Sequence, residues 1–195
     1  MKVGVLAVEG AVAEHVQALS TLDVETVLVR LPSDLNEISA LVIPGGESTT
    51  IRKLLSDYNL VEPLQKRIQE GLPVLGTCAG MVLLAKKIAD SDMKTLGVMD
   101  IDVKRNAFGR QVDSFETELS VPDLGSDKFK GVFIRAPIIK KVEPNVEVLC
   151  TLGEDIVAAR QDKLVALAFH PELTDDLRFH NYFLGIVTGR DYCKK

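Results

Sequence analysis

Residues 73–80, Pro-Val-Leu-Gly-Thr-Cys-Ala-Gly, join a short apolar run to the helix-like segment 81–88 and indicate the class of fold. The run 73–76 reads as a short buried strand, and it leads directly into a Gly-x-Cys-x-Gly sequence. A tight turn of this form lifts one side chain above the carboxyl end of a strand, at the start of a helix. We therefore expect an open α/β sheet with Cys78 at its carboxyl edge.

Strand-like and helix-like patterns alternate ahead of this turn. The strand-like runs are 3–8, 24–29 and 40–43, and the helix-like runs are 12–19, 48–55 and 61–70. The strands are nearly continuously apolar, as in the interior of a parallel sheet, and Ser48 is suited to cap the second helix. The alternation predicts an open, mostly parallel, twisted sheet with helices on both faces, a flavodoxin-like arrangement.

After about residue 96 the pattern changes to short strand-like runs separated by turn residues. These runs are 97–103, 115–121, 131–134, 146–151, 155–160 and 164–169. We expect antiparallel strands added to the sheet or lying over it, followed by a final helix at about 175–187. Because no linker or repeat interrupts the pattern, residues 1–195 are predicted to form one domain.

Composition limits the class of protein further. The chain has 23 Lys and Arg against 28 Asp and Glu, a net charge of −5, which argues against binding to nucleic acid or an anionic membrane. No run approaches the roughly 18–20 apolar residues of a membrane helix, and no signal peptide is recognisable, so we expect a cytoplasmic protein. Three Cys cannot complete a disulfide framework, which favours a reduced protein in which a special Cys does chemistry.

Cys78 is the candidate for that chemistry. A helix N-terminus favours an anion and would stabilise a thiolate, while the N–H of Ala79 can point at a developing oxyanion. A buried structural Cys is about as compatible with this pentapeptide taken alone. Cys150 is expected in a core strand, and Cys193 is expected to be an incidental thiol near the terminus.

His170-Pro171-Glu172 can supply the base and the orienting carboxylate that such a nucleophile needs. His170 follows an apolar run and so lies at a strand end, and a residue two positions on projects to the same side. A plain turn with a helix-capping carboxylate is the alternative. Of the other histidines, His15 is expected on the polar face of a surface helix, and His180 is expected to be solvated or partly packed.

Pro44-Gly45-Gly46-Glu47-Ser48 follows a buried strand, and its Gly pair leaves N–H groups free to donate to an oxyanion or a carboxylate. A simple strand-to-helix turn would have the same sequence. Arg105 and Arg135 can clamp a substrate carboxylate, although a solvated charge is the more frequent role of a single Arg. The sequence contains no motif with metal-ligand spacing, so no metal or other cofactor is expected.

Taken together, PGGEST at 44–49, GTCAG at 76–80 and HPE at 170–172 resemble the class I, or triad, glutamine amidotransferases. Within that family the chain is most similar to the glutaminase subunits of pyridoxal phosphate synthases. That closer similarity rests on VGVLAVEG at 3–10, FIRAP at 133–137 and AFHPELT at 168–174. The resemblance covers essentially the whole chain.

The resemblance implies that Cys78 attacks the side-chain amide of L-glutamine, that His170 relays the protons and that Glu172 orients His170. It also implies an oxyanion hole formed by the N–H groups of Gly46 and Ala79. The implied glutamine contacts are Gly46, Glu47, Ser48, Arg105, Ile134 and Arg135. The ammonia would pass to a synthase subunit built as a (β/α)₈ barrel, in a large hetero-oligomer that makes pyridoxal phosphate (vitamin B6).

Two other functions stay open. The chain could be a triad glutaminase that serves a different synthase. It could also be a non-catalytic protein with a Cys at the same turn, acting as a redox sensor or a binding module. Such proteins lack the late His-Pro-Glu sequence, so its presence here argues against the second alternative.

Overall fold

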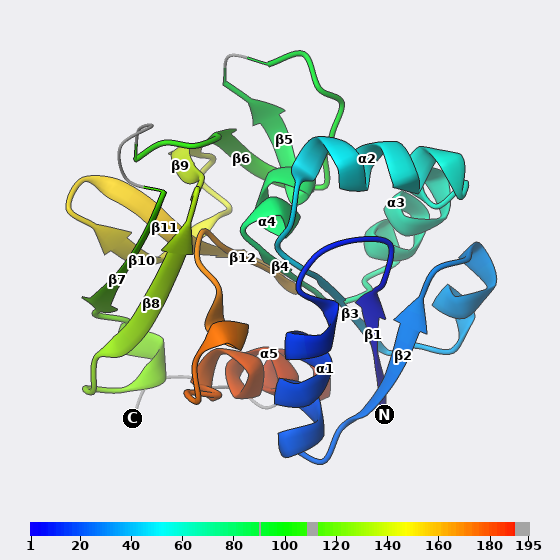
Figure 1. Cartoon of the computed structure of the whole chain (residues 1–195), viewed down its shortest axis with the longest axis horizontal. Helices are drawn as coiled ribbons and strands as arrows, with labels where there is room; N and C mark the ends of the chain where they lie inside the picture. Colours follow the sequence, from blue (N-terminus) through cyan, green and yellow to red (C-terminus); the bar gives the residue numbers. More distant parts are fainter. Residues whose placement is uncertain (90, 109–112, 190–195) are drawn as a thin grey trace.

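The computed structural model describes residues 1–89, 91–108 and 113–189, and within these ranges a ten-stranded sheet forms the frame (Figure 1). Five neighbouring strands are parallel, in the order β2-β1-β3-β4-β12. Their bounds are β1 Lys2–Leu6, β2 Glu25–Val29, β3 Ala40–Ile43, β4 Val74–Thr77 and β12 Leu164–Leu167. Their buried side chains form the centre of the core, which confirms the predicted parallel sheet.

Helices cover both faces of this sheet, as the sequence predicts (Figure 1). One face carries α1 Val12–Thr21 and α5 Arg178–Thr188, and the other carries α2 Ser48–Asp57, α3 Val61–Gln69 and α4 Ala79–Leu84. Short 3₁₀ turns are η1 Pro32–Asn36, η2 Pro122–Leu124 and η3 Pro171–Leu173. The helices bury apolar residues three or four positions apart, such as Ile51 and Leu55 of α2.

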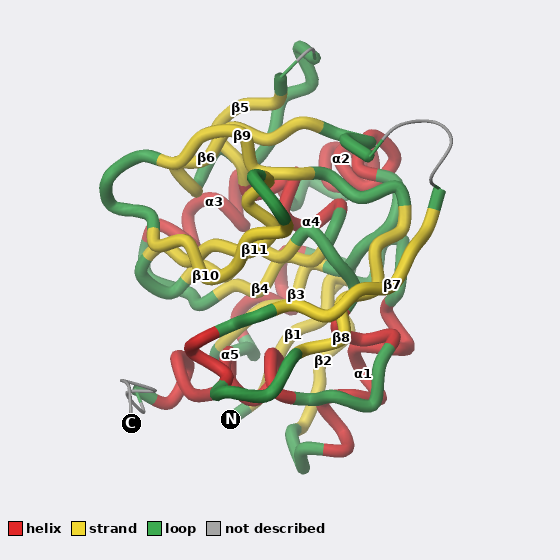
Figure 2. Tube along the Cα trace, turned by 90° about the vertical axis from the view of Figure 1, so that its left-hand side faces the viewer, coloured by secondary structure: helices red, strands yellow, loops and turns green. Residues whose placement is uncertain are grey.

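The second half of the chain extends the sheet with the expected antiparallel strands. In order outward from β12 these are β11 Asp155–Gln161, β9 Ile138–Val142 and β6 Met99–Lys104, and β10 Glu147–Leu152 also pairs with β11. A separate antiparallel ribbon consists of β7 Ser114–Leu119 and β8 Phe129–Ile134, seen side by side in Figure 2. Strand β9 is not among the strands predicted from the sequence.

The prediction of a helix at 81–88 is wrong for its second half. Helix α4 ends at Leu84, and Ala85–Ile88 is instead strand β5, parallel to β6 at the edge of the sheet. The carbonyls of residues 83, 84 and 85, which a longer helix would need, accept hydrogen bonds from the segment 95–98. Contacts from a later segment therefore end the helix, which its own apolar sequence does not predict.

Candidate active site

Three neighbouring strands deliver the candidate residues to one edge of the sheet. Strands β3, β4 and β12 are adjacent and parallel, so their carboxyl ends lie together. The first leads into Gly45 and Gly46, the second into Cys78 and the third into His170. Sequence segments more than a hundred residues apart thereby meet at one site.

The turn after β4 has the strained geometry expected of a nucleophile on a sharp strand-to-helix turn. Cys78 has φ +47° and ψ −102°, a conformation that a residue with a side chain rarely adopts. A Cβ at Gly80 would lie 2.0 Å from the carbonyl oxygen of Ile43, so only glycine allows α4 to pack this close to β3. The Cys78 side chain is 7% exposed, and its Sγ lies 3.7 Å from the carbonyl oxygen of Ile134.

His170 and Glu172 form a close buried pair. The imidazole Nδ1 lies 2.6 Å from Oε1 of Glu172, and the backbone N–H of His170 donates to the carbonyl of Val132 in β8. Burial alone would lower the pKa of His170, but hydrogen bonds to Cys78 and Glu172 and their negative charges outweigh it and raise this pKa to about 10. The arrangement therefore favours a protonated His170 imidazolium.

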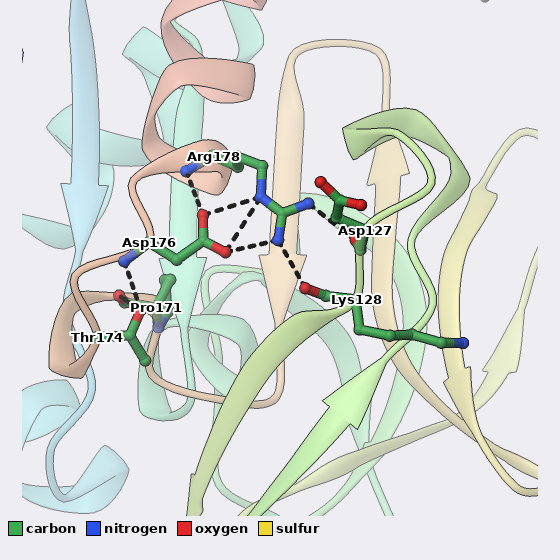
Figure 3. Close-up of polar contacts among 6 residues, drawn as sticks. All are labelled: Asp127, Lys128, Pro171, Thr174, Asp176 and Arg178. Carbon is green, nitrogen blue, oxygen red and sulfur yellow. Dashed lines mark hydrogen bonds and ion pairs between the residues drawn. The ribbon is translucent and has the colours of Figure 1, made fainter.

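The loop that follows this pair is tied down by a polar cluster, drawn in Figure 3. Thr174 donates to the carbonyl of Pro171, and the Asp176 carboxylate accepts two hydrogen bonds from Nε and one from Nη2 of Arg178. The same guanidinium donates to the carbonyls of Asp127 and Lys128 at 2.9 and 2.8 Å. Helix α5 is thus anchored to the start of β8, which holds η3 and its Glu172 in place.

A cavity of about 660 Å³ opens over the three strand ends. It is lined by every residue predicted for the site except Glu172: Gly46, Glu47, Ser48, Cys78, Ala79, Arg105, Ile134, Arg135 and His170. Glu172 lies behind His170, where it contacts the imidazole and does not reach the cavity. The residues chosen from three separate motifs and two isolated arginines therefore meet around one space.

The second half of the chain adds most of the wall residues that sequence reasoning missed. The missed residues are Val82, Asn106, Asp113, Ser114 and Pro137. Asn106 and Arg135 both have positive φ, at +47° and +44°, so strained backbone gathers around this cavity. Asn106 beside Arg105 is the one local signal available, because Asn tolerates the left-handed conformation better than most residues.

The two arginines are placed differently. Nη1 of Arg105 donates to Oγ1 of Thr49 at 3.2 Å, so its guanidinium is held over the start of α2. The Arg135 side chain is 75% exposed, and its Nε lies 3.9 Å from the Asp113 carboxylate. Arg135 is consequently the more available cation for an incoming carboxylate.

Ser48 does not cap α2, contrary to the expectation. Glu47 is the N-cap residue, and its carboxylate accepts hydrogen bonds from the N–H groups of Thr49 and Thr50. Burial would raise the pKa of Glu47, but these bonds outweigh it and lower the pKa. The Glu47 N–H donates to the Glu9 carboxylate at 3.0 Å, so both backbone and side chain hold the loop. The Glu47 carboxylate, one residue earlier, therefore has the capping role that was expected of Ser48.

The expectations for His15 and His180 are wrong. Both are completely buried, and Nδ1 of His15 lies 3.1 Å from Nε2 of His180. The His15 and His180 rings, from α1 and α5, lie against each other, and His15 also contacts Thr77 and Glu172, so the face of α1 that carries residue 15 is turned toward the core. Cys150 is buried in β10 as expected, where burial raises its pKa to about 11, while Cys193 lies outside the described residues.

Two kinds of feature are absent from the part of the chain that the structure describes. Residues 1–89, 91–108 and 113–189 contain no group of three or more His, Cys, Asp or Glu side chains placed to hold a metal ion. Across the same ranges no helix is both long and apolar enough to cross a membrane.

Solved structures place this fold among the glutamine amidotransferases. A crystal structure described as a glutamine amidotransferase matches with a TM-score of 0.90 and 48% identity, covering 95% of this chain and 98% of that one. A glutamine amidotransferase from Thermotoga maritima shares the fold with a TM-score of 0.62 at 15% identity, covering 97% and 85% of the two chains.

The chain belongs to the SNO glutamine amidotransferase family, whose model matches residues 5–188. Two relatives are each named pyridoxal 5'-phosphate synthase subunit PdxT. The protein from Carboxydothermus hydrogenoformans is 58% identical, covering 94% of this chain and 96% of its own length. The protein from Pelotomaculum thermopropionicum is 61% identical, covering 94% of each chain.

Proposed function

We propose that this chain is a glutaminase that hydrolyses L-glutamine to L-glutamate and ammonia, with residues 1–195 acting as one domain. The observation that carries the proposal is the meeting of Cys78 and His170 at one cavity, with Glu172 2.6 Å behind the imidazole. The family and the full-length similarity to PdxT proteins support it. A nucleophile, a base and an orienting carboxylate are the parts that acyl transfer needs.

In the first half-reaction the Cys78 sulfur attacks the side-chain amide carbon of glutamine. The carbon–sulfur bond forms, the carbon–nitrogen bond breaks, and the His170 imidazolium gives its proton to the departing ammonia. In the second half-reaction water attacks the glutamyl thioester and loses a proton to His170. Glutamate leaves, and the thiolate–imidazolium pair is restored.

The oxyanion of each step is assigned to the N–H groups of Gly46 and Ala79. Both residues line the cavity next to Cys78. No residue in the described part of the chain accepts a hydrogen bond from either N–H, so both can donate to a ligand. Donors already in position stabilise the developing charge without reorganising.

Glutamine binding is assigned to the rest of the cavity wall, namely Gly46, Glu47, Ser48, Arg105, Ile134 and Arg135. A guanidinium can pair with the α-carboxylate of the substrate, and the exposed side chain of Arg135 is placed to do so. Since the Glu47 carboxylate already caps α2, Glu47 is expected to serve glutamine through its main chain.

The ammonia is proposed to pass to the synthase subunit of a pyridoxal 5'-phosphate synthase, in the cytoplasm. The names of the PdxT relatives support this partner. We further propose that the partner is a (β/α)₈ barrel in a large hetero-oligomer and that this chain carries no cofactor of its own. Neither of the other two functions left open by the sequence is favoured by a specific observation.

The test is glutamine hydrolysis by the full chain, with and without the synthase subunit from the same organism. Cys78→Ala should lower the rate by at least about 10⁴-fold. Cys150→Ala, at a second buried Cys away from the cavity, is the matched control and should keep wild-type activity. Full activity in Cys78→Ala would contradict the mechanism, and activation only by a different synthase would contradict the partner.

A further inference from the structure

We propose that His15 and His180 extend the Cys78–His170–Glu172 chain on its buried side, with His15 as a positioning residue for Glu172 and His180 setting the tautomer of His15. The proposal rests on the glutaminase function above. It starts from the oxygen of Glu172 that His170 does not use. That atom, Oε2, is buried and makes no hydrogen bond within the described part of the chain.

A donor stands beside this oxygen. Nε2 of His15 lies 3.4 Å from Oε2 of Glu172 and 3.1 Å from Oγ1 of Thr77, the residue just before Cys78. The side chains of His15 and Glu172 are both fully buried, so no water competes for the contact. Hydrogen bonds of active sites are often long in a free enzyme and tighten when substrate binds. A small rotation of the imidazole would make this contact a hydrogen bond.

The pattern of contacts assigns the protons on both rings. Nδ1 of His180 is buried without a hydrogen-bond partner among the described residues, while its Nε2 lies 3.1 Å from Nδ1 of His15. A buried N–H without an acceptor is costly, so the proton of His180 belongs on Nε2, from which it is donated to His15. Because Nδ1 of His15 then accepts, its own proton must be on Nε2, which faces Glu172 and Thr77. The chain of donors runs from His180 through His15, whose Nε2 is hydrogen-bonded to Oγ1 of Thr77 at 3.1 Å and lies 3.4 Å from Oε2 of Glu172.

Both rings are neutral at ordinary pH. Burial lowers the pKa of His15 well below its usual value, and the nearby His180 and His170 lower it further. Burial also lowers the pKa of His180, to about 4. Neutral donors can position the Glu172 carboxyl group without adding a positive charge that would compete with the His170 imidazolium. A Lys or Arg in place of His15 would compete with His170 for that charge.

The titratable groups around Glu172 are few. His170 and His15 face its two oxygens, with His180 behind His15. Glu14 and Asp175 line a second cavity, of about 580 Å³, that reaches Glu172 beside α1. If a change at His15 alters the pH dependence of the reaction, it must therefore act through the His170–Glu172 pair.

The experiment measures kcat, KM for glutamine and the pH–rate profile of the full chain with its synthase subunit. In His15→Leu, which keeps the volume and removes the donor, kcat should fall about ten- to a hundredfold with KM within twofold, as for other residues that orient a reacting group through a hydrogen bond. The acidic limb of the kcat profile should also move, because the hydrogen bond between His170 and Glu172 helps to raise the pKa of His170. His180→Leu should show the same changes, about three- to tenfold in kcat.

Leu19→Ala is the matched control, since Leu19 is buried on α1 one turn from His15 and its side chain has no polar group. It should lower the thermal stability while kcat and the acidic limb stay as in the wild type. If folded His15→Leu has a wild-type kcat and pH profile, the inference is wrong. Should His15→Leu not fold, His15→Gln and His15→Asn decide in its place. The Gln amide reaches the position of Nε2 and the shorter Asn does not, so equal kcat values for the two would overturn the proposal.

The same measurements separate this proposal from the function on which it rests. Glutamine hydrolysis by the wild type that Cys78→Ala abolishes, together with unaffected His15 and His180 variants, would remove the positioning role and leave the glutaminase intact. No hydrolysis by the wild type in the presence of its synthase subunit would remove both.

Discussion

The two sides of the His170–Glu172 pair differ in access to water and in the kind of groups that face them. On the open side lie Cys78, the cavity and two arginines, one of them with a side chain 75% exposed. On the closed side lie His15, His180 and Thr77, all fully buried. Substrate has to enter and leave on the first side, whereas hydrogen bonds on the second are strengthened by a low dielectric. In the proposed mechanism, the open side binds substrate and the closed side orients the His170–Glu172 pair.

Among variants that keep Cys78, His170 and Glu172, the largest expected effect comes from adding a side chain at Gly45, between the two sides of the site. A Cβ at Gly45 would lie 2.3 Å from Cε1 of His170 and 3.2 Å from Cβ of Cys78. Because the imidazole is held by Glu172, Gly45→Ala must displace it, and kcat/KM for glutamine should fall about a hundredfold or more. The measurement is steady-state hydrolysis with the synthase subunit present.

Gly153→Ala is the control for that change. Gly153 has φ +61° in a surface turn and no heavy atom near its would-be Cβ, so the variant should lose about 1 kcal/mol of stability and keep its activity. A wild-type kcat/KM in Gly45→Ala would mean that the imidazole can move without loss of activity. That result would contradict the proposed difference between the open and the closed side of the site.

A smaller effect is expected on the open side. Arg135→Ala and Arg105→Ala should each raise KM for glutamine about ten- to a hundredfold, because a hydrogen bond to a charged group contributes about 1.5–3 kcal/mol. Their kcat should change less than in His15→Leu. Lys104→Ala, an exposed cation next to Arg105 that does not line the cavity, should leave both constants unchanged. A loss of kcat with unchanged KM in the arginine variants would contradict the separation of roles.

The smallest expected effect is on the free energy of unfolding in acid, and it comes from the histidines of the closed side. Folding lowers the pKa of His180 from 6.5 to about 4, so below about pH 6.5 the unfolded chain binds a proton that the folded chain excludes. The free energy of unfolding should therefore fall as pH drops, by about 2 kcal/mol between pH 7 and pH 5 from this residue, and His15 acts in the same direction.

Chemical unfolding at several pH values tests that expectation. In His180→Phe the dependence on pH should be flatter than in the wild type, because the group that takes up the proton is gone. Leu19→Ala should be less stable at every pH with the slope unchanged. A slope in His180→Phe equal to that of the wild type would show that His180 is not held neutral by the fold.

Much of the site follows from sequence, because its motifs report on local geometry. Gly76 and Gly80 around Cys78 are readable as a tight turn between a strand and a helix, and the positive φ of Cys78 agrees with that reading. His170 and Glu172 make the predicted short contact, although Pro171–Leu173 is a 3₁₀ turn and not the extended segment that the prediction assumed. The parallel direction of strands β1 to β4 follows from the alternation of strands and helices.

Other features depend on contacts that no local pattern contains. The end of α4 at Leu84 is decided by hydrogen bonds from residues 95–98, and the wall residues Asn106 and Asp113 reach the cavity only through strand pairing in the second half. In the sequence, His15 lies among polar residues that are typical of the exposed face of a surface helix. It is buried because α1 turns it toward Thr77, Glu172 and His180, which come from much later in the chain.

The sequence by itself identified the candidates for the nucleophile, its base and the carboxylate behind the base, because each follows an apolar run that becomes strand β4 or β12. Tertiary structure alone decided what surrounds them: the space that admits glutamine on one side and the dry imidazole pair on the other. The physical reason is that burial belongs to the packed molecule. A histidine becomes a neutral donor in a low-dielectric interior only when segments from distant parts of the chain pack around it.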